Sequence, residues 1–176
     1  MDKVNNVLDK WSAFLKLDKF ADEPHPERPG EISEGDTGPV AQVIPTEKKE
    51  EMAEQESMTA LVSKLFVSRN QAHIFHLGTS SFSEHKALNM YYDEIVELVD
   101  GIAQSTSGIY GNLSGYTSGD VVDWTSTEDT IAYFRGLYAA VQTERKAVYQ
   151  DSYIQNQIDE ICQLLGDTIY QLKLNK

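Results

Sequence analysis

The sequence has little of what several classes of protein depend on. It holds a single cysteine, Cys162, so an internal disulfide is excluded and no cysteine cluster is available to bind zinc. It also has no run of about 18 apolar residues, the length that a membrane-spanning helix needs, and no signal-peptide core behind Met1. We therefore expect a cytoplasmic protein that stays out of the membrane.

Positive charge is also scarce. The chain has 15 Lys and Arg residues against 28 Asp and Glu residues, which gives a formal net charge of −13. Such an acidic chain is repelled by the phosphates of nucleic acids and by anionic lipid surfaces. We therefore expect no direct binding to DNA.

Proline is confined to one stretch of the chain. All five prolines lie between residues 21 and 46, together with glycines and acidic residues and without a periodic apolar face. This composition predicts an acidic, disordered linker over residues 21–56, which includes the charged run of residues 47–51. Before it, apolar residues spaced by three and four predict an amphipathic helix over residues 1–20. Its apolar residues are Val4, Val7, Leu8, Trp11, Phe14 and Leu15.

Residues 57–176 show the apolar periodicity of four helices. We expect these helices at about 58–78, 83–106, 125–148 and 154–172. A stretch rich in Gly, Ser and Thr over residues 105–119 is too long for a tight turn and separates the second helix from the third. Nowhere does the strict alternation of a β-strand persist. The pattern therefore predicts an all-α fold, a four-helix bundle with a long crossover between its second and third helices.

Histidine is concentrated at one place. Three of the four histidines, His73, His76 and His85, flank the loop between the first two predicted helices. Side chains with oxygen atoms follow at near-helical spacing, and imidazole and carboxylate groups together can hold a transition metal. These side chains are Asn89, Asp93, Glu97, Asp100 and Gln104. The alternative interpretation is that the acids and histidines are solvated at helix ends and that the neighbouring aromatic residues only form core.

A set of residues spread over 71–103 carries a likeness to a known family. The residues are Gln71, Ala72, His73, Gly78, Phe82, His85, Leu88, Ile95, Leu98, Asp100 and Ala103. This segment resembles the ferroxidase stretch of the Dps proteins, the mini-ferritins known as DNA-binding proteins from starved cells. The resemblance implies a ferritin-like four-helix bundle, iron as the bound metal, and a homo-oligomer that assembles through dimers, up to a dodecamer.

The resemblance also implies which residues would hold iron. In Dps proteins two histidines and three acidic residues form a site that is shared between two subunits of a dimer. His73 and His85 fill the histidine positions and Asp100 fills one acidic position, whereas Asn89 and Gln104 replace the other two acids. Each replacement removes a negative charge from a site for divalent iron. We therefore expect a Dps-like iron-binding, iron-oxidising protein with a degenerate ferroxidase site; a weaker single-metal site and a bundle without metal are the alternatives.

A second motif lies in the predicted linker, at Ile32, Ser33, Glu34 and Gly35. It resembles the cleavage signal of T-even-type phage prohead proteases, and the resemblance implies a cut between Glu34 and Gly35. The alternative function is therefore a phage structural or internal virion protein that uses a ferritin-like fold without catalysis. Residues 1–34 would then be a removable segment that contacts the capsid or another protein. In the other interpretation, residues 1–20 stay attached and dock on the bundle or on a partner.

Overall fold

The computed structural model describes residues 46–174, and within this range every regular element is a helix. The helices are α2 (Thr46–Gly78), α3 (Phe82–Tyr110), α4 (Thr127–Glu144) and α5 (Ser152–Lys173). The predicted all-α fold is thus confirmed for this part of the chain. The helix predicted over residues 1–20 and the linker predicted up to residue 45 lie outside the described residues.

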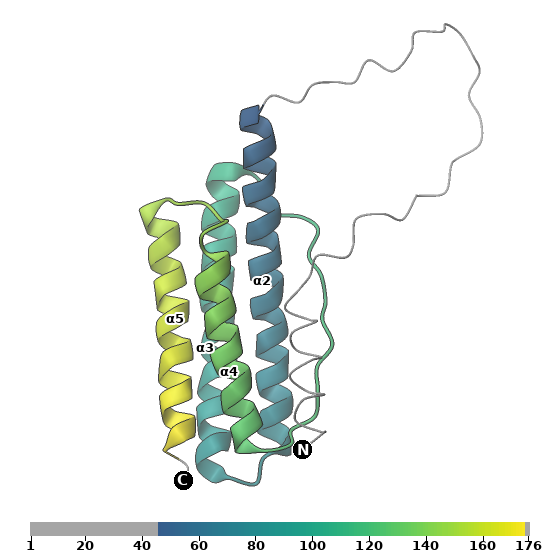
Figure 1. Ribbon diagram of the computed structural model, residues 1–176, viewed down its shortest axis with the longest axis vertical. Helices are drawn as coiled ribbons and strands as arrows, with labels where there is room; N and C mark the ends of the chain where they lie inside the picture. The colour runs from purple at the N-terminus through teal and green to yellow at the C-terminus, as the bar shows by residue number, and fades with distance from the viewer. Residues whose placement is uncertain (1–45, 175–176) are drawn as a thin grey trace, which may run out of the picture. The chain divides into compact units, whose positions relative to one another are not determined.

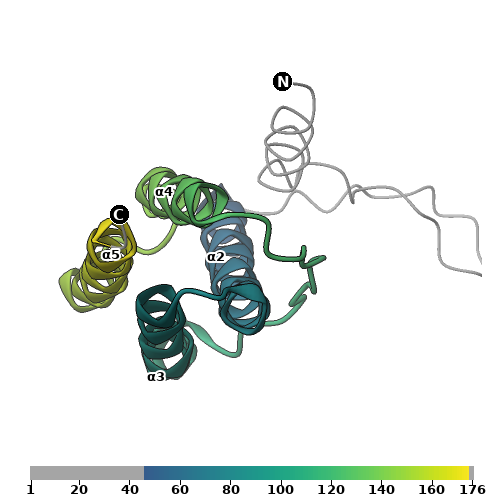
Figure 2. The same cartoon turned by 90° about the horizontal axis from the view of Figure 1, so that it is seen from below.

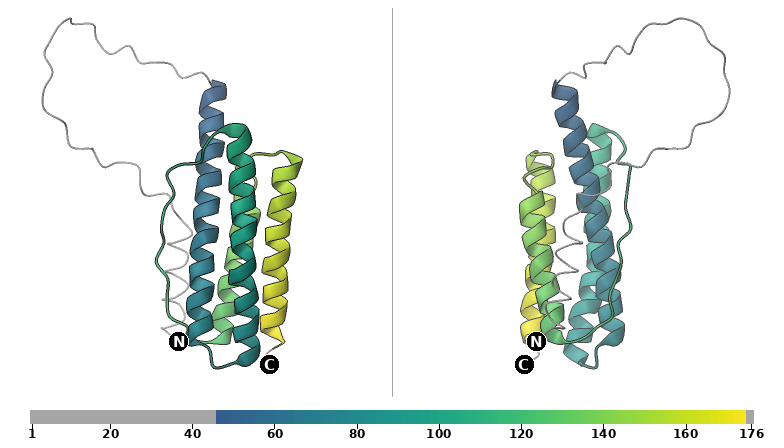
Figure 3. Two further views of the ribbon diagram at one scale, coloured as in Figure 1. Left: turned by 180° about the vertical axis from the view of Figure 1, so that it is seen from behind. Right: turned by 45° about the vertical axis from the view of Figure 1, so that its right-hand side comes forward.

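The four helices pack side by side with their axes close to parallel (Figure 1). Seen along the bundle, α2 and α5 each lie beside both α3 and α4, while α3 and α4 occupy opposite corners (Figure 2). The connection formed by residues 111–126 runs back along the bundle, so α4 starts at the same end as α3 (Figure 3). Neighbouring helices are therefore antiparallel.

Apolar stripes of the four helices meet in one continuous core. The stripe on α5 is the most regular, and its members repeat at three and four residues, as one face of a helix requires. Its fully buried side chains are Ile154, Ile158, Ile161, Leu165 and Leu172. Tyr91 of α3 lies at the centre of the core, where its hydroxyl is 2.6 Å from Ser68 Oγ of α2 and its ring packs edge-on against Phe134 of α4.

Three helix boundaries differ from the expectation, the simplest being that α4 ends at Glu144 and not near residue 148. Helix α2 begins at Thr46, although we expected the bundle to begin near residue 57. Residues 46–56 are rich in Glu, Lys, Gln, Met and Ala, which favour helix without an apolar face that would reveal it. Helix α3 continues into the first part of the expected loop and ends at Tyr110, with Gly111 as its C-cap, whose φ of 90° favours glycine.

Side chains of α2 hold the long connection in place. Gln71 Nε2 donates to the carbonyl of Val122 at 2.7 Å, and the Val122 amide donates to Gln71 Oε1 at 2.8 Å. The Thr117 amide similarly donates to Ser63 Oγ at 3.1 Å. The Gln71 side-chain amide therefore completes the hydrogen bonds of the Val122 N–H and C=O, which no strand partner provides.

Candidate functional site

The predicted metal ligands divide into two groups along α2 and α3. His73, His85 and Asn89 are half-buried near the end of the bundle where α2 passes into α3. Asp100 and Gln104 are exposed on α3, and at about 1.5 Å per residue Asp100 lies roughly 16 Å along the helix from Asn89. A single chain therefore does not bring the five residues together.

His76 and His85 form a close pair that joins α2 to α3. Their rings stack with centroids 3.6 Å apart. His76 Nδ1 lies 3.0 Å from the carbonyl oxygen of His85, and His85 Nδ1 lies 3.1 Å from that of His76. Because a carbonyl only accepts, each Nδ1 carries the proton and donates it, which leaves each Nε2 with a lone pair in the neutral ring.

His73 has a different set of contacts. Its ring stacks on Tyr92 with centroids 4.5 Å apart, and its Nδ1 lies 3.4 Å from Arg69 Nη1. The Arg69 guanidinium also lies over the Tyr92 ring, 5.5 Å from its centroid. Since a guanidinium only donates, Nδ1 of His73 is the acceptor, and in the neutral ring Nε2 then carries the proton. In this arrangement neither nitrogen of His73 has a lone pair free for a metal.

The two amides that replace acids are engaged with their neighbours. Asn89 Nδ2 donates to Asp93 at 2.7 Å, and Asn89 Oδ1 accepts from the Tyr92 hydroxyl at 2.8 Å. Gln104 Nε2 donates to Asp100 at 2.7 Å. Each amide therefore donates an N–H group to a neighbouring carboxylate.

These contacts do not fit the iron site that the resemblance implies. Across residues 46–174, no three His, Cys, Asp or Glu side chains gather closely enough to hold a metal ion. Iron prefers anionic oxygen ligands alongside imidazole, and only Asp100 remains of the three expected carboxylates. A permanent cation, Arg69, also lies against His73. A site shared between two copies would thus have His85 and Asp100 as its only suitable ligands among the predicted set.

A buried carboxyl group lies at the same end of the bundle and was not singled out by sequence reasoning. Glu84 of α3 is fully buried, and its oxygens accept from the hydroxyls of Thr79 at 2.7 Å and Thr127 at 2.8 Å and from Trp124 Nε1 at 3.0 Å. Ser81 is the N-cap of α3 and accepts from the amide of Glu84, whereas the Ser81 amide donates to Thr79 Oγ1, so the reciprocal bond of a capping box is not formed. Glu84 thereby fastens the loop after α2, the end of the long connection and the start of α4 to one point. The sequence signal that could have revealed it is the Ser-x-x-Glu pattern at residues 81–84.

The opposite end of the bundle carries a pair of stacked tyrosines. The Tyr110 and Tyr149 rings lie 3.8 Å apart between centroids, and the Tyr110 hydroxyl donates to Asp151 at 2.5 Å. This hydrogen bond raises the pKa of Tyr110 to about 12, because the phenolate could not donate to a carboxylate. The buried Tyr149 hydroxyl has no hydrogen-bond partner within the described part of the chain, and burial raises its pKa.

The Tyr110 contact predicts a pH dependence at the alkaline end. The native state favours the neutral phenol, so its contribution to stability is complete below pH 10 and is lost as the pH rises from 10 through about 12. Asp151→Asn should bring the pKa of Tyr110 down toward 10, because it removes the acceptor charge. Absorbance titration at alkaline pH would measure this, with Tyr110→Phe assigning the signal. An unchanged titration curve in Asp151→Asn would contradict the prediction.

Two predictions remain, one on membrane spans and one on cleavage after Glu34. Among the described residues, no helix is long and apolar enough to cross a membrane. Glu34 and Gly35, the predicted cleavage site, lie outside the described residues, so the processing of residues 1–34 stays a prediction.

Comparison with known proteins gives one match. Residues 76–172 match a family described as "Family of unknown function (DUF5856)". No curated protein and no solved structure matches the chain. The matched region begins at His76 and runs through α3, α4 and α5, so it includes His85, Asn89, Asp100 and Gln104 but not His73. Because the match covers more than half of the chain, this protein belongs to the family DUF5856.

Proposed function

We propose that this protein is a ferritin-like, Dps-like subunit that assembles with copies of itself and has a structural role in place of iron oxidation. The antiparallel order of neighbouring helices and the single long connection between α3 and α4 support a ferritin-like fold, since one long crossover marks that class of bundle. The observation that carries the structural role is the contact of Arg69 with His73. It places a permanent cation beside a histidine to which the resemblance assigns iron.

The surface proposed for self-association is the outward side of α2 and α3, which we call the α2–α3 face. It comprises Phe66, Asn70, His73 and Leu77 of α2 and Asn89, Tyr92, Val96 and Asp100 of α3, spaced by three, four or seven residues along each helix. Leu77 is 69% exposed, Phe66 39% and Val96 38%, so this face offers three large apolar side chains to a partner.

Charge beside the α2–α3 face suits a two-fold contact, because Arg69 contacts His73 and Tyr92 of this face. In such a contact the same patch meets itself, so a cation on one copy can lie against an anion on the other. Arg69 has no carboxylate partner within residues 46–174, and Asp100 is bonded only to Gln104 there. Arg69 of one copy and the acidic α3 of the other are therefore complementary.

Iron binding and oxidation is the second candidate function. The observation that favours it is His85, whose Nδ1 donates to a backbone carbonyl, as metal-binding histidines commonly do, leaving Nε2 to face a ligand. His85 of one copy and Asp100 of its neighbour would hold the metal, and iron would supply the redox chemistry. Asn89 and Gln104 would contribute at most neutral oxygens.

The setting we propose for the structural role is a phage particle, in which residues 1–34 deliver the bundle and are then removed. The cytoplasm is the setting for a mini-ferritin. Mass spectrometry of the mature protein distinguishes them, since a chain that starts at Gly35 supports the particle and an intact Met1 terminus opposes it. Neither proposal includes DNA as a partner, because the chain carries a net charge of −13.

The first experiment measures assembly and iron oxidation on the same preparation. Light scattering after size-exclusion chromatography should show a stable dimer or larger, and Phe66→Glu should shift it to monomer because a buried, unpaired carboxylate opposes association. Met52→Glu is the matched control, since Met52 is similarly exposed, at 45%, but lies outside the α2–α3 face.

Anaerobic ferrous titration followed by air tests the second candidate. We expect the wild-type chain to oxidise iron no faster than a variant with His73→Ala and His85→Ala. Stoichiometric oxidation that the double substitution abolishes would contradict the structural role and establish a mini-ferritin. A wild-type monomer would contradict self-association in either function.

A further inference from the structure

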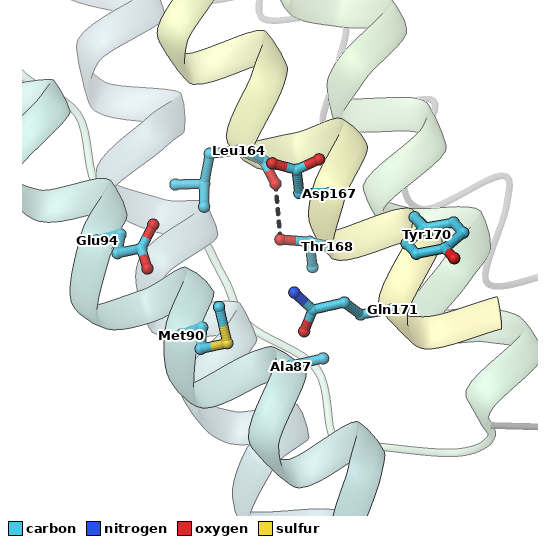
Figure 4. A pocket seen from close by; sticks show the side chains of 8 residues that line it. All are labelled: Ala87, Met90, Glu94, Leu164, Asp167, Thr168, Tyr170 and Gln171. Carbon is cyan, nitrogen blue, oxygen red and sulfur yellow. Dashed lines mark hydrogen bonds between the residues drawn. The ribbon is translucent and has the colours of Figure 1, made fainter. Parts of the chain in front are cut away.

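A hollow of about 180 Å³ lies between α3 and α5 (Figure 4), and none of its lining residues belongs to the α2–α3 face. Ala87, Met90 and Glu94 of α3 line one wall, and Leu164, Asp167 and Gln171 of α5 line the other. Side chains of Met90, Glu94 and Gln171 point toward the space between the helices (Figure 4). We call this hollow the α3–α5 groove.

The floor of the α3–α5 groove is apolar. Ala87 is 2% exposed and Leu164 8% exposed, so these two core residues form the bottom of the groove. Thr168 donates its hydroxyl to the Leu164 carbonyl at 2.8 Å, which leaves its methyl group as the surface it offers. Met90 is 44% exposed beside this floor, and methionine adapts readily to an incoming apolar group.

The rim of the groove carries charge of one sign. Glu94 and Asp167 are both exposed carboxylates on opposite walls, and no Lys or Arg is among the lining residues. Neither carboxylate has an ion-pair partner within residues 46–174. The next outward acid on α3, Glu97, extends the same charge along the groove edge. An occupant that brings positive charge would therefore be electrostatically favoured.

The size of the groove decides the kind of occupant. Its volume is about 180 Å³. Pockets for small-molecule ligands are larger, at about 300–1,000 Å³. One or two side chains of a protein fill the observed space.

We propose that the α3–α5 groove binds a segment of a partner protein through a lysine or arginine side chain next to an apolar one. The aliphatic stem of the basic residue lies on Met90 and Leu164, as long cationic side chains do on apolar surfaces. Its charged head lies between Glu94 and Asp167, and Gln171 accepts a hydrogen bond from it. This interaction is independent of self-association through the α2–α3 face, so either proposal can fail while the other stands.

The test uses the full chain and a fluorescent synthetic amphipathic helix of leucine and lysine as the probe. Fluorescence anisotropy should show binding, and the same helix with glutamate in place of lysine should not bind. Glu94→Gln combined with Asp167→Asn should weaken binding about three- to tenfold, the effect of losing two exposed charge contacts. The matched control, Asp123→Asn with Glu128→Gln, makes the same charge change away from the groove and should alter affinity less than about twofold.

Location is tested with methionine substitutions and methyl signals. Met90→Lys places an internal cation in the groove and should abolish probe binding, whereas Met52→Lys, at a similarly exposed position, should not. In protein labelled at the methionine methyl groups, the probe should shift the signal of Met90 and leave that of buried Met58 unchanged.

Three results would overturn the proposal. Equal weakening by the groove variant and the control variant would mean that the probe responds to net charge alone. A shift of Met52 without Met90 would place the contact elsewhere. Dissociation of the protein's own oligomer by Met90→Lys, with no shift from the probe, would assign the groove to a second copy of this chain.

Discussion

Replacing Glu84 by alanine is expected to lower the free energy of unfolding by about 4 kcal/mol. The substitution leaves the hydroxyls of Thr79 and Thr127 and the indole N–H of Trp124 without their acceptor. Each hydrogen bond to a carboxyl group of this kind contributes about 1.5–3 kcal/mol, and the three contributions overlap because they share one group. Urea denaturation followed by circular dichroism measures the change.

Two further variants make the Glu84 result specific. Glu84→Gln keeps one acceptor oxygen and should lose about half as much stability as Glu84→Ala. The amide nitrogen that replaces the other oxygen cannot accept from the donors that lie there. Glu128→Ala, an exposed glutamate in the first turn of α4, should change stability by about 0.5 kcal/mol or less. An alanine variant at position 84 that unfolds at the same urea concentration as the wild-type chain would show that the three donors find other partners.

Glu84 also explains how the long connection reaches a fixed end point. Residues 111–126 have no helix or strand of their own, so the ladder bonds that fix a regular element are missing. Gln71 makes two hydrogen bonds with the backbone of Val122, and Ser63 accepts one from the Thr117 amide. Glu84 adds a side-chain bond from the Trp124 indole. The end of α2 and the start of α3 therefore determine where α4 begins.

Apolar periodicity was sufficient to predict the helices and their core faces. The α5 stripe from Ile154 to Leu172 is buried as expected, because burial alone determines which side of a helix faces its neighbours. Periodicity could not reveal that α2 begins at Thr46 or that α3 passes residue 106. Those segments have few apolar residues. Their helical state depends on backbone propensity and on contacts between helices, such as the hydrogen bond from Ser105 of α3 to Gln157 of α5.

The candidate site was predicted only in part. The prediction placed His73, His76 and His85 beside one short loop, and the structure does bring them together, with His73 and His76 rings 5.8 Å apart and His76 stacked on His85. The protonation of each ring could not be predicted, because it depends on which atom faces Nδ1. A carbonyl faces His76 and His85, and a guanidinium faces His73.

Replacing Gly78 by alanine is expected to destabilise the fold by about 2–3 kcal/mol, although alanine is the better helix former. A methyl group at position 78 would lie 2.5 Å from Cβ of Trp124 and 3.6 Å from its Cα, so the backbone of the connection must move and not only a side-chain tip. That movement would draw Trp124 Nε1 away from Glu84. The change is measured by urea denaturation, with tryptophan fluorescence reporting the displaced indole.

Gly101→Ala is the matched control for this effect. Gly101 is an exposed helical glycine, and a methyl group there meets nothing within 4 Å, so alanine should raise stability by about 0.5–1 kcal/mol. The two substitutions make the same chemical change in helices and should have opposite signs. If both stabilise the protein, the close approach of Trp124 to α2 does not occur in solution, and the bonds of Gln71 and Ser63 hold the connection instead.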